Sequence, residues 1–336
     1  MKVLITGATG LIGKVLIEKF FSTGAKVNFL TTKKSKIHSI KGASGFYWSP
    51  AKKILDLKCF DGVDSIIHLA GSRISKPWTK SNKKDILSSR VDSTRLLFLS
   101  LKNNIESFHI KNIVSASAIG IYPSEFKKIQ TEKTNTTSNS FMERVVVAWE
   151  KEIENFSSLN IPVAKIRIGL VLSFSGGVLK ALKIPTKLGL GTYFGNGNQG
   201  QPWIHINDLV EIFFKAYKDN WDGIFNAVAP NPVSQEKLAK TLAITLKRPF
   251  FLPPFPKYLL KSLIGEMSHL VLDSHWVSSQ KVLDKGFNFV EKFILKQWEA
   301  KISDSVVTEI DAKTKLQEQT LKKFKSLPKY KLISNT

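Results

Sequence analysis

Several features that are common in proteins are scarce in this chain of 336 residues. Its single cysteine, Cys59, excludes a disulfide framework and a cysteine-based zinc site, and we expect no bound metal. No uncharged apolar run reaches about 18 residues, so we expect no membrane span. The N-terminal MKVLITGATG runs directly into a strand and a turn, without the cleavage site of a signal peptide. We therefore expect a soluble, cytoplasmic protein.

Arginine is also scarce, although the chain is strongly basic. There are 50 Lys and Arg against 27 Asp and Glu, giving a formal net charge of +23, yet only six of the basic residues are Arg. Arg supplies the bidentate contacts that read bases and clamp phosphates. We therefore expect no nucleic-acid partner, while binding to nucleic acid or to an anionic membrane surface stays open as an alternative that rests on charge alone.

The chain does contain an alternation of strand and helix patterns. A hydrophobic fraction of 43% is sufficient for a buried core. Helices expected at 11–22, 80–102 and 141–158 lie between strands expected at 2–6, 26–31, 45–48, 64–70, 111–116 and 162–168. This alternation predicts an α/β fold, a doubly wound Rossmann parallel sheet.

The second half of the sequence is less regular. Residues 174–203 contain seven glycines and two prolines, which favours loops over regular structure. We expect a helix at 207–218 with Asn207 as N-cap, a strand at 223–228, and a helix at 235–246 capped by Ser234. The predicted domains are an NAD(P)-binding domain at 1–175, to which 204–229 returns; a smaller irregular α+β substrate lobe at 176–300; and a Lys-rich, partly disordered tail at 301–336.

Residues 6–13, TGATGLIG, hold glycines at a spacing that indicates dinucleotide binding. Gly7 permits a tight turn out of the strand, Gly10 lets the backbone approach a pyrophosphate, and Gly13 permits close helix packing. The N-terminus of the following helix presents N–H groups to the phosphates. We assign cofactor binding to Gly7, Thr9, Gly10, Leu11, Ile12 and Gly13.

The end of the second strand decides which dinucleotide is preferred. An acidic residue there would accept a hydrogen bond from the ribose of NAD. The chain has TTKKSK at 31–36 instead, whose hydroxyl and ammonium groups favour a 2′-phosphate. We therefore predict NADP (NADPH) over NAD, with Thr32 and Lys33 as contacts, although a solvated Lys run is the alternative. We also assign cofactor contacts to Leu69, Ala70 and Gly71, where the nicotinamide ribose would pass.

These motifs make the chain similar to the extended short-chain dehydrogenase/reductase superfamily, and within it to epimerase-family proteins with a C-terminal domain of unknown function. The resemblance covers about residues 1–296 and includes HLAG at 68–71, SASAIGIY at 115–122, RIGLVLS at 167–173, PWIHINDLV at 202–210 and KGFNF at 285–289. It implies an NAD(P)-dependent epimerase/dehydratase or reductase that acts on a small-molecule substrate. It also leaves a homodimer open, formed through the helices at 80–102 and 141–158.

The superfamily uses a Tyr as acid/base, a Lys four residues later and a Ser that orients the substrate. Ser117 matches the Ser position, with Ser115 as a neighbouring candidate for the same position that is also assigned to the cofactor. Aligned on Trp149-Glu150, the Tyr and Lys positions fall at Met142 and Val146, which cannot transfer protons. A catalytically silent NADP-binding protein with a regulatory or scaffold role is therefore the alternative to an enzyme.

Several other residues are candidates for the site. Tyr122, after the fifth strand, is either a replacement proton donor or a packed aromatic. Arg167 binds an anionic cofactor or substrate group, or pairs with a carboxylate. The remaining substrate candidates are Arg90, otherwise a helix-packing residue; Trp203; and His205, otherwise a hydrogen-bonded residue beside Asp208. Glu143 and Arg144 are expected to face solvent.

Overall fold

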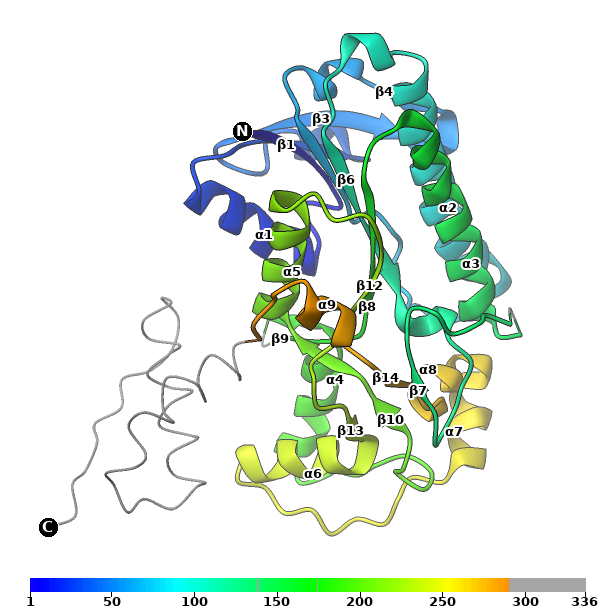
Figure 1. Ribbon diagram of the computed structural model, residues 1–336. Coiled ribbons are helices and arrows are strands. Elements are labelled where there is room, and N and C mark those ends of the chain that lie inside the picture. Colours follow the sequence, from blue (N-terminus) through cyan, green and yellow to red (C-terminus); the bar gives the residue numbers. More distant parts are fainter. Residues whose placement is uncertain (138, 174, 290–336) are drawn as a thin grey trace, which may run out of the picture. The chain divides into compact units, whose positions relative to one another are not determined.

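The computed structural model describes residues 1–137, 139–173 and 175–289 (Figure 1). The chain divides into two compact units, Met1–Lys285 and Gly286–Thr336, and only 286–289 of the second are described. The predicted tail at 301–336 lies outside the described residues, as does the end of the predicted substrate lobe at 290–300. The described helices and strands and all of the candidate site residues belong to the first unit.

A sheet of eight strands forms the centre of this unit (Figure 1). The strands are β1 Lys2–Thr6, β2 Lys26–Thr31, β3 Ala43–Ser49, β4 Ile54–Leu55, β5 Ser65–His68, β6 Asn112–Ala118, β8 Val163–Ile168 and β12 Gly223–Ala227. Their order is β12-β8-β6-β5-β1-β2-β3-β4, and every pairing is parallel except the antiparallel β3–β4. The predicted doubly wound Rossmann sheet is thus confirmed.

Helices cover both faces of the sheet. They are α1 Leu11–Ser22, α2 Lys80–Lys102, α3 Phe141–Glu154 and α5 Ile206–Lys218. α1 packs beside α5 on one face and α2 beside α3 on the other (Figure 1). Because both faces are covered, β5 is buried along its whole length and β1 along all but its first residue.

The rest of the unit is built from short elements. Three two-stranded pairs are parallel β9–β11, antiparallel β10–β13 and parallel β7–β14. Their bounds are β7 Ile129–Gln130, β9 Leu170–Ser173, β10 Gly200–Gln201, β11 Trp203–His205, β13 Val233–Ser234 and β14 Trp276–Val277. The helices are α4 Gly177–Lys187, α6 Gln235–Thr245, α7 Lys257–Ile264, α8 His269–Leu272 and α9 Gln280–Asp284.

Three expectations about helices need correction. The loop expected at 174–203 contains α4, which begins at Gly177 with Gly176 as its N-cap, includes Pro185 and packs on β9 and α6. The helix expected at 141–158 ends at Glu154 and continues as a 3₁₀ turn. The N-cap of α5 is His205, whose side chain accepts a hydrogen bond from the Asn207 N–H, whereas the predicted Ser234 cap of α6 is confirmed. Tertiary packing and a capping imidazole thus override local composition.

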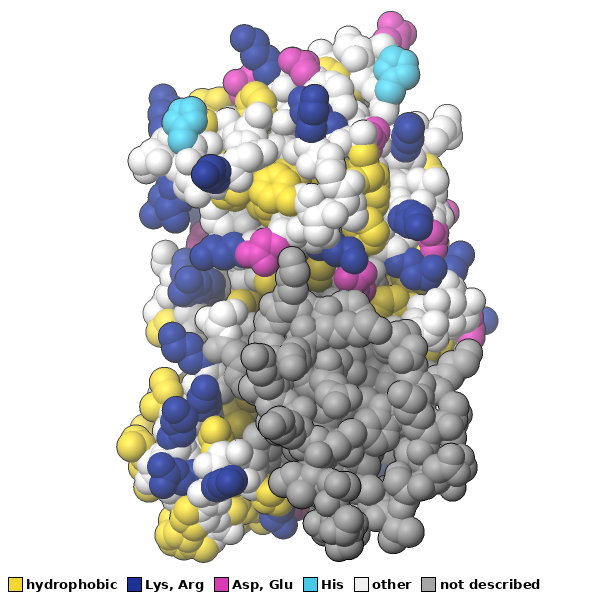
Figure 2. Space-filling model, turned by 90° about the vertical axis from the view of Figure 1, so that its left-hand side faces the viewer, with side chains coloured by type: hydrophobic (Ala, Val, Ile, Leu, Met, Phe, Trp, Pro, Cys, Tyr) yellow, Lys and Arg dark blue, Asp and Glu magenta, His cyan; other side chains and the backbone are white. Residues whose placement is uncertain are grey.

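Basic side chains are scattered over the surface of the described residues. On the face that Figure 2 shows, Lys and Arg alternate with acidic, uncharged and hydrophobic side chains over several elements. None of the helices in the described residues is long and apolar enough to cross a membrane. Within the same residues, no group of His, Cys, Asp and Glu is placed to hold a metal ion.

Candidate functional site

The glycine-rich turn connects the end of β1 to the start of α1. Gly7 has a φ of +68°, and a Cβ at this position would lie 2.7 Å from the Leu69 carbonyl oxygen. A Cβ on Gly13 would lie 2.4 Å from the Gly7 carbonyl oxygen, so both positions require glycine. Gly10 is exposed at the N-cap of α1, where no side chain caps the helix and no acidic residue occupies the first turn. The turn therefore offers free N–H groups to an anion, as a pyrophosphate site needs.

The end of β5 lies beside this turn. The Oγ1 of Thr6 accepts hydrogen bonds from the N–H groups of Leu69 and Ala70, each 3.0 Å long. From the neighbouring strands β1 and β5 the sheet continues in opposite directions, to β2 on one side and to β6 on the other. Doubly wound proteins bind their ligands at the carboxyl ends of strands at such a point. The structure thus brings the predicted contacts at 7–13 and 69–71 together.

His68, the last residue of β5, holds this edge in place. Its Nδ1 lies 2.8 Å from Thr6 Oγ1 and its Nε2 lies 3.0 Å from Thr94 Oγ1. Complete burial lowers the pKa of His68 to about 3. The imidazole is therefore neutral at physiological pH and serves to join β1, β5 and α2.

This buried imidazole makes stability depend on pH. The unfolded chain binds a proton on His68 below its ordinary pKa of 6.5, whereas the folded protein does so only near 3, so stability falls as pH drops through this window. We expect urea unfolding to show a loss of about 2 kcal/mol between pH 7.5 and pH 5 from this residue. Over the same pH interval, the His68→Gln protein should lose about 2 kcal/mol less stability than the wild-type protein. An equal loss of stability in both proteins would contradict the assignment.

The predicted NADP-selecting segment follows β2, the neighbour of β1 in the sheet. Thr32 and Lys33 are exposed. The buried Thr31 side chain accepts a hydrogen bond from the Lys33 N–H at 3.2 Å, which fixes the start of the segment. Lys34 extends over the Tyr47 ring, with its Nζ 5.3 Å from the ring centroid. The segment thus presents free hydroxyl and ammonium groups at the same edge as the glycine turn.

A buried polar network lies at the carboxyl ends of β6 and β8. The Arg167 guanidinium donates to both carboxylate oxygens of Glu150, at 2.8 Å each, and to the Tyr122 hydroxyl at 2.9 Å. Ser117 donates to Glu150 at 2.5 Å, and Tyr122 donates to Asn226 at 2.7 Å. Burial opposes the charge on Arg167, but the hydrogen bonds and the charge of Glu150 outweigh it and raise its pKa. Of the two roles predicted for Arg167, an anionic ligand or a carboxylate of the protein, the structure shows the pairing with a carboxylate.

The network engages both predicted catalytic residues. Ser117 is 2% exposed and Tyr122 is 1% exposed, and the O–H of each already has an acceptor. Burial raises the pKa of Tyr122 despite the opposing charge of Arg167. Ser115 lies apart from this network and donates to the Ala116 carbonyl at 3.1 Å. The structure thus brings Ser117, Tyr122 and Arg167 together as one buried group.

Arg90 lies on α2 against the segment that follows β5. Its Nη1 donates to the carbonyl oxygens of Ser72 and Ile86 at 3.2 and 2.9 Å, and its guanidinium lies 5.3 Å from the Trp149 ring centroid. Burial lowers the pKa of Arg90 to about 10, against the opposing effect of Asp85. A Cβ on Gly71 would lie 3.1 Å from the guanidinium carbon. Arg90 therefore stands beside the predicted cofactor edge.

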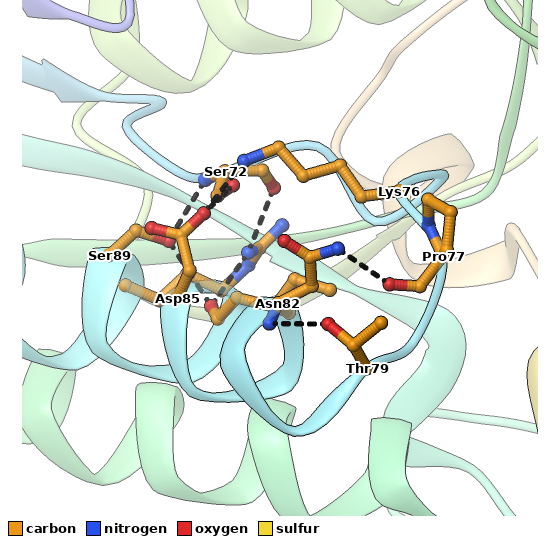
Figure 3. Close-up of polar contacts among 9 residues, drawn as sticks. Ser72, Lys76, Pro77, Thr79, Asn82, Asp85 and Ser89 are labelled. Atoms are coloured by element: carbon orange, nitrogen blue, oxygen red, sulfur yellow. Dashed lines mark hydrogen bonds and ion pairs between the residues drawn. The ribbon is translucent and has the colours of Figure 1, made fainter.

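The same segment is tethered to α2 by further polar contacts (Figure 3). Ser72 donates from its N–H to Ser89 at 2.9 Å and from its hydroxyl to Asp85 at 2.6 Å. Lys76 donates to the same carboxylate at 2.8 Å, and the bonds from Lys76 and Ser72 lower the pKa of Asp85. This tether fixes the segment between the cofactor edge and a neighbouring pocket.

That pocket has a volume of about 550 Å³. Its wall includes residues 118–120 after β6, 168–170 after β8, and 139–143 at the start of α3. Ile74 and Trp78 line it from the tethered segment. The wall also includes 122–124, Thr137, 200–202 and parts of 266–275. The pocket therefore lies at the same edge of the parallel sheet as the glycine turn.

Only some of the predicted site residues line the pocket. Tyr122 belongs to the wall, as does Met142 at the expected Tyr position, whereas Val146 packs in a core cluster with Tyr122. Trp203 and His205 are outside the wall. The Trp203 indole donates to the Asn231 carbonyl at 3.1 Å, and burial lowers the pKa of the capping His205.

Four polar residues have roles that the sequence did not predict. Glu143 was expected to face solvent, but it is 5% exposed and accepts hydrogen bonds from the Thr137 hydroxyl and the Asn139 N–H. His275 lines the pocket, and its Nδ1 is buried without a hydrogen-bond partner in the described residues. Glu150 and Asn226 complete the buried network. Glu150 and Asn226 gave a signal in the sequence, since both lie in stretches that carry the family resemblance, Trp149-Glu150 and FNAVAPNPV at 225–233.

The fold and this edge define a class of protein. A doubly wound sheet with a glycine turn at its switch point is a nucleotide-binding domain of the short-chain dehydrogenase/reductase type. The model of the NAD dependent epimerase/dehydratase family matches residues 3–227, and the chain belongs to that family. A domain of unknown function, DUF1731, matches residues 255–291. The chain is thus an NAD(P)-binding, epimerase-like protein.

Three known relatives each match at least 85% of this chain. The epimerase family protein SA0724 of Staphylococcus aureus is 33% identical over 287 residues, 85% of this chain and 94% of the relative. The human epimerase family protein SDR39U1, solved with NADPH, is 26% identical with a TM-score of 0.75, over 87% of this chain and 96% of that one. A nucleoside-diphosphate sugar epimerase from Corynebacterium glutamicum is also 26% identical, with a TM-score of 0.68, over 96% of this chain and 66% of that one.

Proposed function

We propose that the protein is an NADP-dependent oxidoreductase or epimerase-like enzyme that acts on a small molecule. The observation that carries this proposal is that the glycine turn and the 550 Å³ pocket share the carboxyl edge of one parallel sheet. Residues 7–13 and 69–71 would hold the dinucleotide, and the nicotinamide would supply hydride transfer. The protein's part is to position and polarise the substrate.

The preference for NADP over NAD rests on Thr32 and Lys33. Their exposed side chains beside β1, and the NADPH bound by the human relative, support it. We expect Lys33→Ala to weaken NADPH binding about tenfold and leave NADH binding unchanged, because a charge-assisted contact to the 2′-phosphate is lost. Titration of nicotinamide fluorescence measures both constants. Lys151→Ala, which removes an exposed Lys from α3 and lies outside residues 31–36, is the matched control. Equal losses for both nucleotides would contradict the proposal.

In this proposal Ser117 orients the reacting oxygen, and Tyr122 or water donates the proton. Ser117 lies near the end of β6 and is not one of the residues that line the pocket, whereas Tyr122 follows that strand and belongs to the wall; their hydroxyls are engaged by Glu150 and Asn226. They would reach a substrate only when the network rearranges. The homodimer through α2 and α3 stays a prediction; exposed Leu87 and Leu99 on α2 support it.

A catalytically silent NADP-binding protein is the second candidate. It is favoured by Met142 and Val146 at the acid/base positions and by the sealed hydroxyls of Ser117 and Tyr122. The experiment is an NADPH titration followed by turnover assays on ketones, aldehydes and sugars. Turnover that Ser117→Ala abolishes, with NADPH affinity retained, supports the enzyme. Binding without turnover favours the silent protein, and no NADPH or NADH binding refutes both.

A further inference from the structure

The pocket wall has an unusual charge for so basic a chain. The protein carries 50 Lys and Arg, yet none of the described residues that line the pocket is Lys or Arg. The wall instead includes the carboxylates of Glu143, Glu266 and Asp273, together with His269 and His275. The excess of Lys and Arg in the chain as a whole is therefore not shared by the described residues of the pocket wall.

Two of the three carboxylates have a basic partner. Glu266 pairs with Lys83 of α2, and Asp273 lies 2.9 Å from His269 Nδ1. Glu143 makes no ion pair in the described residues, and its hydrogen bonds come from the uncharged Thr137 hydroxyl and Asn139 N–H. Burial lowers the pKa of His275, although Asp273, Glu143 and the Pro123 carbonyl act in the opposite direction. The wall thus presents a negative charge and a neutral imidazole.

The N-terminus of α3 also reaches the wall, and a helix N-terminus is a common phosphate site. Here Ser140 caps the helix by accepting from the Glu143 N–H at 3.1 Å. The Glu143 carboxylate lies in the first turn and accepts from the Asn139 N–H at 2.9 Å. The end of the helix that would attract an anion is therefore already occupied by the protein's own carboxylate.

The rest of the wall is largely apolar. Trp78 and Phe141 meet edge to face with ring centroids 4.9 Å apart, and Ile119, Met142 and Leu170 also line the pocket. Diphosphates are held in proteins by Arg and Lys, whose charges offset the loss of hydration. A nucleoside diphosphate would find no such group among the described lining residues and would meet Glu143 instead.

We infer that the pocket takes an uncharged or cationic substrate with an apolar part, and that it excludes the diphosphate of a nucleotide sugar. The polar group of this substrate would meet Glu143 and His275, while its apolar part would pack on the aromatic and aliphatic wall. This inference rests on the proposed function, because it treats the pocket as the substrate site.

The test compares three probes of one shape and different charge on the full-length protein. Benzyl alcohol, benzylamine and benzoate are titrated at pH 7.5 by saturation-transfer NMR, and UDP-glucose is offered as a competitor. We expect benzyl alcohol and benzylamine to bind, benzoate to bind at least about tenfold more weakly because of the wall carboxylate, and UDP-glucose not to compete. Met142→Trp, which fills the pocket, should abolish binding of the first two.

A charge-neutral variant sharpens the test. Glu143→Gln keeps a carbonyl acceptor for Thr137 and Asn139 while it removes the charge. We expect it to strengthen benzoate binding several-fold, to weaken benzylamine binding several-fold, and to weaken benzyl alcohol binding by no more than about twofold, because the amide carbonyl still accepts from its hydroxyl. Glu152→Gln makes the same substitution on the same helix at an ion pair with Arg95, away from the wall, and should change none of the three.

Several results would overturn the inference. These are displacement of benzyl alcohol by UDP-glucose, equal affinity for benzoate and benzyl alcohol, or no binding by any of the three probes. An NADPH titration on the same sample separates the two proposals. If NADPH binds and UDP-glucose competes with the probes, only the inferred substrate class is refuted. If NADPH does not bind, the proposed function itself is refuted.

Discussion

Glu150→Gln should destabilise the protein by about 3–5 kcal/mol in urea unfolding, because it leaves a buried guanidinium without its carboxylate. Arg167 is 4% exposed and binds both oxygens of Glu150, so the amide N–H₂ of Gln would face guanidinium donors. Ser117 would lose its charged acceptor as well. This is the largest effect on stability that we expect from a single isosteric change in the network.

The control for this prediction lies on the same helix. Glu152→Gln removes the same charge from a pair with Arg95, whose side chain is 52% exposed. Exposed pairs contribute roughly 0–1 kcal/mol because water and salt screen them. If the two variants unfold at the same urea concentration, the network does not have the role in stability assigned to it.

Gly7→Ala should cost about 3 kcal/mol and abolish measurable NADPH binding, since two separate penalties add at this position. The backbone has a φ of +68°, which strains any residue with a Cβ. That Cβ would also lie 2.7 Å from a backbone oxygen of Leu69, and backbone cannot rotate away as a side chain can. Urea unfolding and a fluorescence titration with NADPH measure the two effects.

Gly24→Ala is the control that shows the backbone penalty without the steric collision. Gly24 has a φ of +73°, but a Cβ there would meet nothing within 4 Å. It should therefore show only the backbone cost, roughly 1–2 kcal/mol, with NADPH binding intact. A Gly7→Ala protein that is no less stable than Gly24→Ala would show that the contact between the glycine turn and the end of β5 is unimportant.

The parts of the site that the sequence predicted are those that local rules control. The glycine turn follows from backbone geometry, since Gly7 and Gly13 sit where a Cβ would collide with backbone atoms. Strands β1 and β5 contain short apolar runs, VLI at 3–5 and II at 66–67, a pattern typical of strands buried on both faces. The Ser234 cap is similarly local, because the hydroxyl bonds an N–H three residues away.

The parts that the sequence missed depend on contacts that helix and strand periodicity do not encode. The glycines and prolines of 174–203 conceal the helix-forming run LKALK at 179–183, which lies in α4 and packs with that helix on β9 and α6. Glu143 is polar and helical, and only Thr137 and Asn139 folding back over it make it a buried acceptor. His275 enters the wall from a segment more than a hundred residues beyond α3.

The sequence by itself determined the doubly wound sheet, the glycine turn and the departure from the Tyr-x-x-x-Lys pair, because strand periodicity and glycine geometry are short-range properties. Only the tertiary structure decided that Ser117, Tyr122 and Arg167 share one buried network with Glu150 and Asn226. It alone showed that the pocket wall is acidic in a chain with a net charge of +23. Charge counts add along a chain, whereas the field in a pocket depends on which few side chains the fold turns inward.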